Sequence, residues 1–332
     1  MGPEDAVIDK VVRALPSAVG RGGEQFRLGI GDDAAILKQA RGLDWVVSCD
    51  AFLEGVHFLS RTHPASSVGY KSLARATSDL AAMGAEPRFF LLTLALPAKQ
   101  TVRWLDDFLW GMARAAHELG IRLLGGDTTS NDKVSLNVTV IGQIAGGRML
   151  TRSGARPGDL IYVSGRLGAA KLGLDLVLIG LGRSRAYHPF TQQHLYPRIQ
   201  VNLGRWLSLN RIASSAIDIS DGFSTDLNRL IRAAGVGAII QSERIPKTAV
   251  PSKVATRLER SLDPLEMALH GGDDYELLFT VPSGRAKRLS SAPGRQKLTC
   301  IGEVTQSRRI LLVGKSGKTR PLKPRGWDSF RD

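Results

Sequence analysis

Cysteine is scarce in this sequence, and Cys49 and Cys300 are its only two cysteines. Two thiols are too few for a disulfide framework, and they lack the spacing of a metal-binding motif. The scarcity excludes a disulfide-stapled secreted domain and favours a reducing compartment. We therefore expect a cytoplasmic protein in which each thiol is a small core residue and not a nucleophile.

Long apolar runs are also missing. No segment is apolar over the roughly 20 residues that a transmembrane helix needs. The N-terminal sequence MGPEDAVIDKVVRAL carries acidic residues before its apolar ones and has no small-residue cleavage site, which differs from a secretory signal. We expect no membrane span and no membrane partner.

Acidic residues are outnumbered by basic ones. The chain has 45 Lys and Arg against 31 Asp and Glu, with a net charge of +14 and a pI near 10.2. This balance suits a nucleic-acid binder or an enzyme with polyanionic substrates. The basic residues are scattered, with modest density at 285–309 and 315–325, and no zinc-finger or helix-turn-helix signature accompanies them. We expect no specific nucleic acid, and nucleic-acid binding stays a remote alternative that the salt dependence of DNA affinity would test.

The length and the changing periodicity indicate two domains. A chain of 332 residues is long for a single hydrophobic core. The segment GGRMLTRSGARPGD at 146–159 is a connector punctuated by Gly and Pro. Strands and helices are intermixed without the regular spacing of a doubly wound parallel sheet. We therefore predict two α+β domains, which span residues 1–148 and 149–332.

Periodicity also places the individual elements. Helical spacing occurs at 5–15, 64–84, 101–119, 168–181, 198–209 and 223–234. Strand-like segments lie at 44–50, 88–97, 121–127, 134–145, 215–219, 237–241, 274–281, 298–304 and 309–313, and a further strand begins at LIYVSG.

A Walker phosphate-binding loop is missing as well. VGKSGKT at 313–319 resembles one, but no glycine stands where the first glycine of the motif must fall. A turn between two C-terminal strands explains this segment better. GIGDDAAIL at 29–37 nearly matches the turn that binds a dinucleotide, yet Asp32 and Asp33 would place two negative charges against its pyrophosphate. The two carboxylates favour a metal-bridged phosphate over a dinucleotide, although Asp32 by itself is also a capping residue.

Carboxylates recur at the ends of apolar segments. GIGDD, VVSCD, IRLLGGD and AIDISDG each deliver an aspartate after such a segment, and the helical ATSDLAAMG adds Asp79. One Asp-Gly after a strand is usually only a turn. Several carboxylates together are costly unless a cation neutralises them, and Mg²⁺ prefers hard oxygen ligands together with phosphates. The pattern predicts a divalent-metal site with a nucleoside triphosphate or another polyphosphate as substrate.

A set of distinctive segments extends in order across nearly the whole chain. The segments are GIGDDAAIL, SCDAFLEGVHF, YKSLARATSDLAAMGAEP, LLGGDTTS, LTRSGARPGD, AIDISDGFSTDL, HGGDDYELLFTV and a late GW. Together they resemble the thiamine-monophosphate kinase family. The wider superfamily includes aminoimidazole ribonucleotide synthetase, selenophosphate synthetase and a hydrogenase-maturation protein. These relatives share SDLAAMGA and GGDTT in looser form. A sibling enzyme with another acceptor, similar to aminoimidazole ribonucleotide synthetase, is the alternative.

The resemblance implies a reaction and an assembly. The reaction is ATP-dependent, Mg²⁺-dependent phosphorylation of thiamine monophosphate to thiamine diphosphate by direct in-line transfer. The assembly is a homodimer in which strands of an N-terminal α/β domain join those of a second subunit into a barrel. A C-terminal α+β domain completes the ATP and substrate site.

The resemblance also implies roles for individual residues. The magnesium shell comprises Asp33, Ser48, Cys49, Asp50, Asp79, Asp127, Asp218 and Asp221. The ATP contacts are Gly126, Asp127, Arg152 and Ser220, and the substrate contacts are His57, Asp273 and Trp327. Of these residues, Asp33, Asp50, Asp79, Asp127 and Asp218 are expected to be catalytic. An arginine fork suits a phosphate, and an indole face suits a cationic ring.

Two positions depart from the family pattern. The family usually has Thr in place of Cys49, and a thiol is a poor ligand for a hard cation unless only the backbone carbonyl binds. The family usually has Glu in place of Asp273, so that the side chain here is one methylene shorter. Glu276 is a lower-ranked substitute for Asp273, and its position favours an ordinary strand residue.

Overall fold

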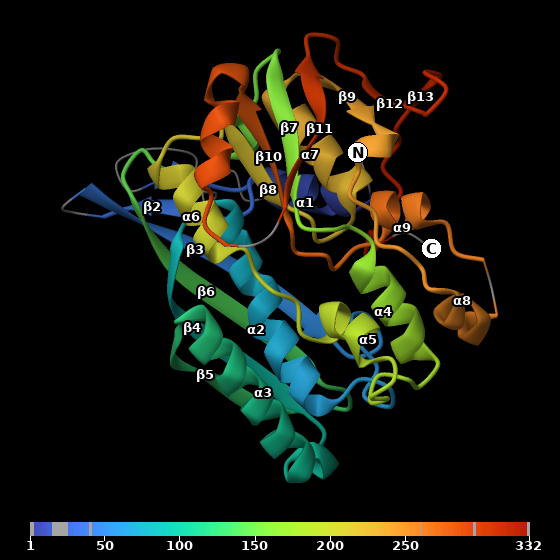
Figure 1. Cartoon of the computed structure of the whole chain (residues 1–332). Coiled ribbons are helices and arrows are strands. Elements are labelled where there is room, and N and C mark those ends of the chain that lie inside the picture. Colours follow the sequence, from blue (N-terminus) through green and yellow to red (C-terminus); the bar gives the residue numbers. More distant parts are fainter. Residues whose placement is uncertain (1–2, 15–25, 40–41, 260, 295–296, 331–332) are drawn as a thin grey trace.

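The computed structural model describes residues 3–14, 26–39, 42–259, 261–294 and 297–330. Its strands form two mixed sheets with helices packed against them, which confirms the α+β architecture (Figure 1). The last strand of one sheet ends at Ala145 and the first strand of the other begins at Asp159. The domain boundary near residue 148 stays a prediction. Within the described residues, no helix combines the length and apolar character that crossing a membrane requires.

The first sheet is built from the N-terminal half. In spatial order its described strands are β1 (Phe26–Leu28), β2 (Ala35–Lys38), β3 (Leu43–Leu53), β6 (Ser135–Ala145), β4 (Glu86–Leu96) and β5 (Arg122–Ser130). Only β4 and β5 pair in parallel within this sheet. A Cβ on Gly126 of β5 would lie 1.7 Å from the carbonyl oxygen of Leu92 on β4. The close pairing at this edge therefore requires glycine there.

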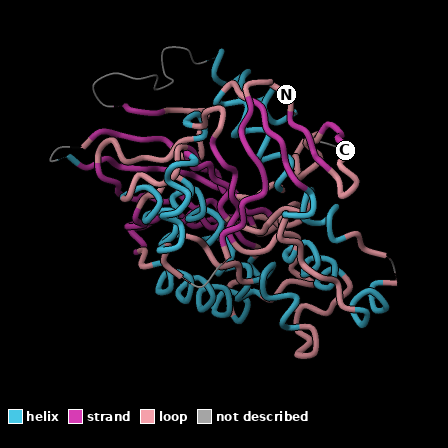
Figure 2. The backbone as a smooth tube through the Cα atoms, turned by 45° about the horizontal axis from the view of Figure 1, so that its top comes forward, coloured by secondary structure: helices cyan, strands magenta, loops and turns pink. Residues whose placement is uncertain are grey.

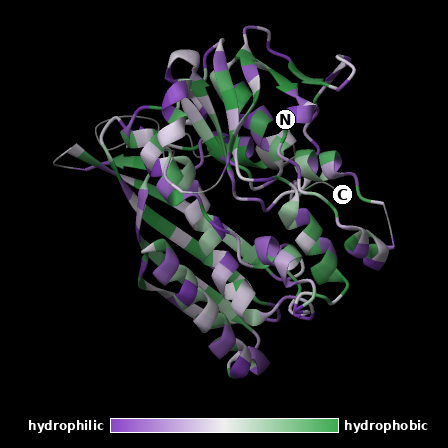
Figure 3. Ribbon diagram, in the orientation of Figure 1, coloured by the Kyte–Doolittle hydropathy of each residue, from purple (hydrophilic) through white to green (hydrophobic). Residues whose placement is uncertain are grey.

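Two long helices cover one face of the first sheet. They are α2 (Ala65–Ala82) and α3 (Arg103–Leu119), and α1 (Pro3–Ala14) precedes the sheet. The buried residues of α3 are Phe108, Gly111, Met112 and Ala115, which follow the i, i+3, i+4, i+7 spacing of an amphipathic helix. In Figure 3, hydrophilic residues recur along α3 and hydrophobic ones along the strands. The helix predicted at 101–119 is confirmed, and its buried residues form one face.

The second sheet is built from the C-terminal half. In spatial order its described strands are β13 (Thr319–Pro321), β12 (Ile310–Val313), β9 (Gly237–Gln241), β11 (Leu298–Thr305), β7 (Asp159–Ser164), β10 (Leu277–Pro282) and β8 (Ser215–Asp218). The helices of this half are α4 (Ala169–Leu178), α5 (His188–Leu195), α6 (Val201–Leu209), α7 (Phe223–Ala234), α8 (Ser252–Leu258) and α9 (Pro264–His270). Short 3₁₀ turns lie at Ala98–Gln100, Arg152–Gly154, Ser242–Arg244 and Ser283–Ser291.

Helix α6 joins the two halves. It belongs to the C-terminal half but packs against α2, and a Cβ on Gly204 would lie 1.9 Å from the carbonyl oxygen of Ala81. A separate apolar cluster fills the junction, with members such as Leu150, Leu207 and Phe279. Figure 2 shows the strands of the two sheets with helices between and around them. The two halves therefore pack against each other through a buried apolar surface.

Most predicted elements are confirmed, and the missed ones are short. The segment 314–318 is a turn between β12 and β13, where the Gly314 N–H donates to the Lys318 carbonyl oxygen. The sequence patterns missed α5, α8, α9, β1, β2 and β13. Helix α9 carries a usable signal, because the Asp263 side chain accepts the Leu265 N–H and Pro264 begins the helix.

Candidate active site

The GIGDD segment lies between two antiparallel strands. β1 ends at Leu28 and β2 begins at Ala35, so the segment leads from strand to strand. Gly31 makes the turn with a φ of +124°, at which a side chain would be strained. A dinucleotide turn requires a helix N-terminus directly after its glycines. The structure excludes that interpretation and buries most of Asp33.

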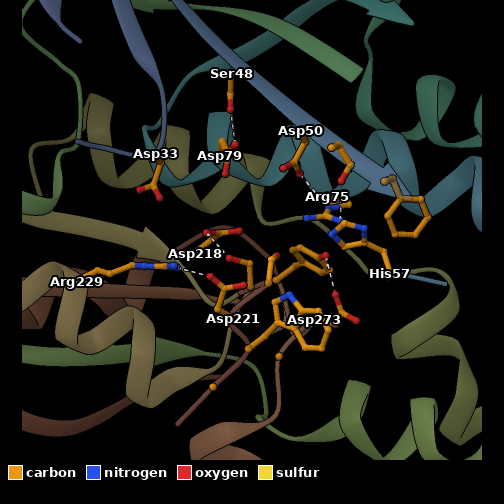
Figure 4. Close-up of a pocket in the computed structure, with 18 of the residues that line it drawn as sticks. Asp33, Ser48, Asp50, His57, Arg75, Asp79, Asp218, Asp221, Arg229 and Asp273 are labelled. Carbon is orange, nitrogen blue, oxygen red and sulfur yellow. Dashed lines mark hydrogen bonds and ion pairs between the residues drawn. The ribbon is translucent and has the colours of Figure 1, made fainter. Parts of the chain in front are cut away.

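A pocket of about 1670 Å³ is lined by residues from both halves of the chain. Figure 4 shows labelled carboxylates and cationic side chains that point into it. The predicted site residues that line it are Asp33, Ser48, Cys49, Asp50, His57, Asp79, Arg152, Asp218, Ser220, Asp221, Asp273 and Trp327. Gly126 and Asp127 do not line it, because they lie on β5, where every residue is exposed. The structure therefore gathers all predicted site residues except these two.

Three aspartates from separate elements form the centre of the pocket. Asp33 precedes β2, Asp79 lies on α2, and Asp218 ends β8. One carboxylate oxygen of each lies within 4.8 Å of the others. Asp33 Oδ2 and Asp218 Oδ2 are buried and accept no hydrogen bond from any residue that the structure describes. Orphaned hard oxygen atoms of this kind fit a divalent cation such as Mg²⁺.

Burial and the neighbouring carboxylates raise the pKa values of Asp79 and Asp218. Burial, followed by the charges of Asp50, Asp218 and Asp33, raises the pKa of Asp79 well above its ordinary value. Burial and the neighbouring Asp33 raise the pKa of Asp218 to about 7. Both causes disfavour the charged form. The cluster is therefore electrostatically incomplete without a cation.

Strand β3 presents Ser48 and Cys49 to opposite faces of the sheet, as strand alternation requires. Ser48 Oγ donates to Asp79 Oδ2 over 2.5 Å, which joins this hydroxyl to the aspartates. The Cys49 thiol is exposed and accepts from Thr139 Oγ1 at 3.2 Å. The prediction of a core thiol is wrong for Cys49, because its side chain lies on the face opposite α2. Cys300 is only partly buried.

Arg152 and Asp32 connect the GIGDD turn to the C-terminal half. The Arg152 N–H donates to Asp32 Oδ2 over 3.1 Å, and the Arg152 guanidinium pairs with Asp33 Oδ1 at 2.5 Å. Burial and the charge of Asp33 raise the pKa of Asp32 to about 6. Asp32 therefore holds the backbone at the start of the C-terminal half. The predicted phosphate contact, Arg152, already neutralises a cluster carboxylate.

Asp221 and Ser220 lie at the start of α7. Arg229 makes a short ion pair with Asp221 and a 3.1 Å ion pair with Asp226. Asp226 Oδ2 also accepts the Asp221 and Gly222 N–H groups, which shapes the SDG turn. Ser220 Oγ is 3.4 Å from Asp218 Oδ1. The turn therefore sets Asp221 beside the aspartate centre, with Arg229 as its countercharge.

His57 and Trp327 line the same pocket. His57 Nδ1 accepts the Leu53 N–H over 3.0 Å, so the neutral ring carries its proton on Nε2. Burial and the nearby Arg75 lower the pKa of His57 to about 4, which keeps the ring neutral. Trp327 is held by its backbone N–H, which donates to the Asp221 carbonyl oxygen, while 49% of the residue is exposed. Its indole is therefore accessible from the pocket.

Asp273 belongs to a network of polar side chains. Lys71 Nζ donates to Asp273 Oδ2 over 2.8 Å, and the Tyr275 hydroxyl donates to Oδ1 over 2.8 Å. His194 links Lys71 to His63 through contacts of 3.1 Å on each side. Burial raises the pKa of Asp273, but the Lys71 charge and His194 outweigh it and hold that pKa well below its ordinary range. The carboxylate of Asp273 is therefore ionised and fixed from behind.

Two family models match the chain in succession. The N-terminal domain of AIR synthase related proteins matches residues 31–144, and the C-terminal domain matches residues 156–315. The thiamine-monophosphate kinase of Escherichia coli K12 is 36% identical over 310 residues, which cover 91% of this chain and 92% of that protein. That of Aquifex aeolicus is 31% identical over 331 residues, with 98% of both chains covered. This chain belongs to the thiamine-monophosphate kinase family.

Solved structures of this kinase family share the fold. AaThiL complexed with AMPPCP and TMP is 30% identical and covers 98% of this chain and 96% of its own, with a TM-score of 0.83. A hydrogenase maturation protein, HypE, is 22% identical with a TM-score of 0.70 and covers 90% of this chain and 93% of its own. That second likeness concerns the fold alone.

Sequence reasoning about this kinase-family chain predicted Arg152 but missed Arg75, which lines the pocket, and Lys71, which donates to Asp273. Lys71 and Arg75 lie on α2 at four-residue intervals before Asp79, so that all three share one face of the helix. This spacing is visible in YKSLARATSD and would have predicted cations beside the carboxylates. His63 and His194 carried no such signal, because only the tertiary fold brings them together.

Glu276 does not substitute for Asp273. It is 7% exposed, accepts from the Ser164 hydroxyl and from Gln200 Nε2, and is absent from the pocket lining. Asp274 was also missed, and it accepts the Gly168 and Ala170 N–H groups at the start of α4. In the DDYE segment, Asp273 therefore faces the pocket while Asp274 and Glu276 organise the structure behind it.

Proposed function

We propose that this protein transfers the γ-phosphoryl group of ATP to thiamine monophosphate, which gives thiamine diphosphate and ADP. The observation that carries the proposal is the aspartate centre with its orphaned oxygens, which opens into the same pocket as His57, Asp273 and Trp327. A phosphate donor and a cationic, phosphorylated acceptor require those two environments next to each other. The family membership and the relative complexed with AMPPCP, an ATP analogue, and TMP support this assignment.

Several Mg²⁺ ions fit the part of the site where the phosphate donor, ATP, is proposed to bind. The residues that would hold them are Asp33, Ser48, Asp50, Asp79, Asp127, Asp218 and Asp221, together with the backbone carbonyl of Cys49. Bound Mg²⁺ would neutralise and bridge the phosphate oxygens. The thiol of Cys49 takes no part, because it lies on the opposite sheet face. The departure from threonine at this position is therefore harmless.

Protein side chains and backbone position the two phosphates. Arg152 and Ser220 of the pocket, together with Gly126 and Asp127 of strand β5, bind ATP in this proposal, and His57, Asp273 and Trp327 bind thiamine monophosphate. An oxygen of the acceptor phosphate attacks the γ-phosphorus as the bond to the ADP oxygen breaks. Because that oxygen is already anionic at neutral pH, no strong general base and no phosphoenzyme are needed. The ionised Asp273 and the neutral His57 are suited to hold the positively charged thiamine moiety.

A homodimer would bring Asp127 to a pocket. All residues of β5 are exposed, including Leu123 at 56% and Leu124 at 57%, and β5 is an edge strand. An exposed, apolar edge of this kind is unfavourable unless another chain covers it. We propose that two copies join here into a barrel, and that Asp127 of the partner subunit completes each site. The strands of the first sheet would then form both the sheet of the N-terminal half and the interface with the second subunit.

The activity is tested in one assay. Purified protein is incubated with thiamine monophosphate, ATP and Mg²⁺, and the thiamine esters are separated by chromatography. We expect thiamine diphosphate only with the monophosphate and metal, and none with EDTA or with plain thiamine. ATP binding without any thiamine diphosphate would overturn the kinase assignment and favour a sibling enzyme with another acceptor, such as one similar to aminoimidazole ribonucleotide synthetase.

A further inference from the structure

Arg75 is a nearly buried cation in the middle of the pocket. Its side chain is 17% exposed, and its Nε donates to Asp50 Oδ2 over 3.0 Å. Nη1 donates to the Ala51 carbonyl oxygen over 3.3 Å, and the guanidinium lies 5.3 Å from the centre of the Phe52 ring. These contacts fix the orientation of the guanidinium plane.

The position of Arg75 is intermediate between the two ends of the pocket. Figure 4 shows it between Asp50, on the side of the aspartate centre, and His57, on the side of the predicted thiamine contacts. It is close enough to Asp273 and Asp221 for their charges to act on it. The acceptor phosphate must lie in this intermediate region if the proposed reaction is right, because it has to meet the γ-phosphate while the thiamine moiety extends to His57.

The chemistry of the guanidinium matches a phosphate. Among the described residues, the hydrogen bonds of Arg75 use the Nε–H and one N–H of Nη1, which leaves the second N–H of Nη1 and both N–H groups of Nη2 for a ligand. Burial lowers the pKa of Arg75, but Asp50 and the other nearby anionic groups outweigh burial and raise it above its ordinary value. Without Arg75, a phosphate beside Asp50 would lie next to a carboxylate with no adjacent countercharge from this helix. A fixed planar fork is well suited to hold it there.

We propose that Arg75 binds the phosphate of thiamine monophosphate and holds it for attack on the γ-phosphate. This inference rests on the proposed kinase function. Asp50 then has two tasks, since one oxygen orients Arg75 and the other remains for the metal ions. Arg75 is a specificity residue in this account, because it distinguishes thiamine monophosphate from unphosphorylated thiamine.

The test compares two ligands that differ only in the phosphate. Isothermal titration measures the affinity of the full chain for thiamine monophosphate and for thiamine, both with Mg²⁺. We expect Arg75→Met to weaken thiamine monophosphate binding by about tenfold or more and to leave thiamine binding within about twofold. Arg75→Lys keeps the charge but loses the fork, and we expect an intermediate loss of about threefold or more. In steady-state kinetics, the KM for thiamine monophosphate should rise and the KM for ATP should not.

A matched control separates this role from a structural one. Arg114 Nε pairs with Glu118 at 2.8 Å on α3, outside the pocket, and Arg114→Met should leave both affinities unchanged. Equal weakening of both ligands by Arg75→Met, or no weakening of either, would overturn the inference. If Arg75→Met does not fold, Arg75→Lys tests the inference through the same comparison, which is the loss of affinity for thiamine monophosphate relative to the loss for thiamine. If the wild-type protein makes no thiamine diphosphate, the proposed function itself is wrong. If the wild type is active but Arg75→Lys leaves the affinity for thiamine monophosphate relative to thiamine unchanged, only this inference is wrong.

Discussion

Single carboxylates in the aspartate centre should make stability depend on pH. Burial and Asp33 raise the pKa of Asp218 to about 7 in the fold, against 3.8 in the unfolded chain. Between these two pH values, the folded chain binds a proton that the unfolded chain releases. The contribution of Asp218 to the free energy of unfolding is therefore fully present below about pH 4 and is lost as the pH rises through about 7. In EDTA, we expect the Tm of the wild type to fall over this interval and that of Asp218→Asn to fall less.

Metal addition provides the control for this pH experiment. Mg²⁺ should restore the wild-type Tm at pH 8 and should have little effect on Asp218→Asn, because a bound cation replaces the proton. The same variant should lose turnover by orders of magnitude, since the centre loses a phosphate-bridging ligand. Identical Tm profiles of the two proteins in EDTA would contradict the electrostatic account of the cluster.

Lys71 should stabilise the fold around Asp273, where thiamine monophosphate is proposed to bind. Lys71→Met would remove the ammonium group that contacts the Asp273 carboxylate and leave it with the Tyr275 hydroxyl and the His194 ring, whose pKa burial lowers. Breaking a fully buried pair costs about 3–5 kcal/mol, and because the Asp273 side chain is 32% exposed we expect about 2–3 kcal/mol. Urea unfolding measures the loss, with the exposed Lys99→Met as control. Adding Asp273→Asn to Lys71→Met should recover part of it, and no recovery would show that the pair is not the cause.

Residue types and spacing predicted the anionic half of the site better than the cationic half. Asp33, Asp79 and Asp218 follow apolar segments, and the fold gathers them as the pattern suggested. Lys71 and Arg75 were readable only as helix positions, and their countercharges, Asp273 and Asp50, come from distant segments. A sequence shows which groups are charged, but pairing depends on tertiary distances.

At the scale of elements, the crossing of α2 and α6 allows a direct test of packing. Gly204→Ala would place a methyl group 1.9 Å from the Ala81 carbonyl oxygen, so one helix must shift. We expect a loss of about 1–3 kcal/mol in the free energy of unfolding, which is typical of overpacking. Gly284→Ala is the control, because nothing lies within 4 Å of its added Cβ. Equal stability of both variants would show that α6 does not pack as closely as described.

Element prediction succeeded where periodicity was long. Helices α2 and α3 extend over 18 and 17 residues, so that an apolar face repeats several times. Helices α8 and α9 have 7 residues each, which is too short for a repeated face, and α5 owes its position to buried contacts such as Leu195. Short helices are stabilised by tertiary packing, and their sequences carry correspondingly little signal.

At the scale of the whole molecule, the pocket exists only because two halves meet. Its aspartates come from β8 in one half and from α2 and the turn before β2 in the other. The chain has a net charge of +14, yet the centre of its pocket is a cluster of three aspartates. A basic exterior attracts nucleotide and phosphorylated substrate, while the acidic interior requires metal to receive them. Composition indicated the first property but not the second.

The proposed composite site should allow two inactive variants to complement each other. Asp127 does not line the pocket of its own subunit, so we expect each pocket to use Asp127 of the partner subunit. Asp127→Asn and Asp79→Asn homodimers should then both be inactive. Their heterodimer should regain activity, because one of its two sites combines an intact Asp79 with an intact Asp127 from the other subunit.

Mixing with subunit exchange and a turnover assay measures this recovery. The expected activity of the mixture approaches about a quarter of wild type, since random pairing makes half the dimers mixed and each mixed dimer has one intact site. Mixing Asp79→Asn with Asp218→Asn is the control, because both residues lie in the same subunit's centre and no intact site can form. If each pocket instead used its own Asp127, every mixed dimer would carry one lesion per site, and both mixtures would stay inactive.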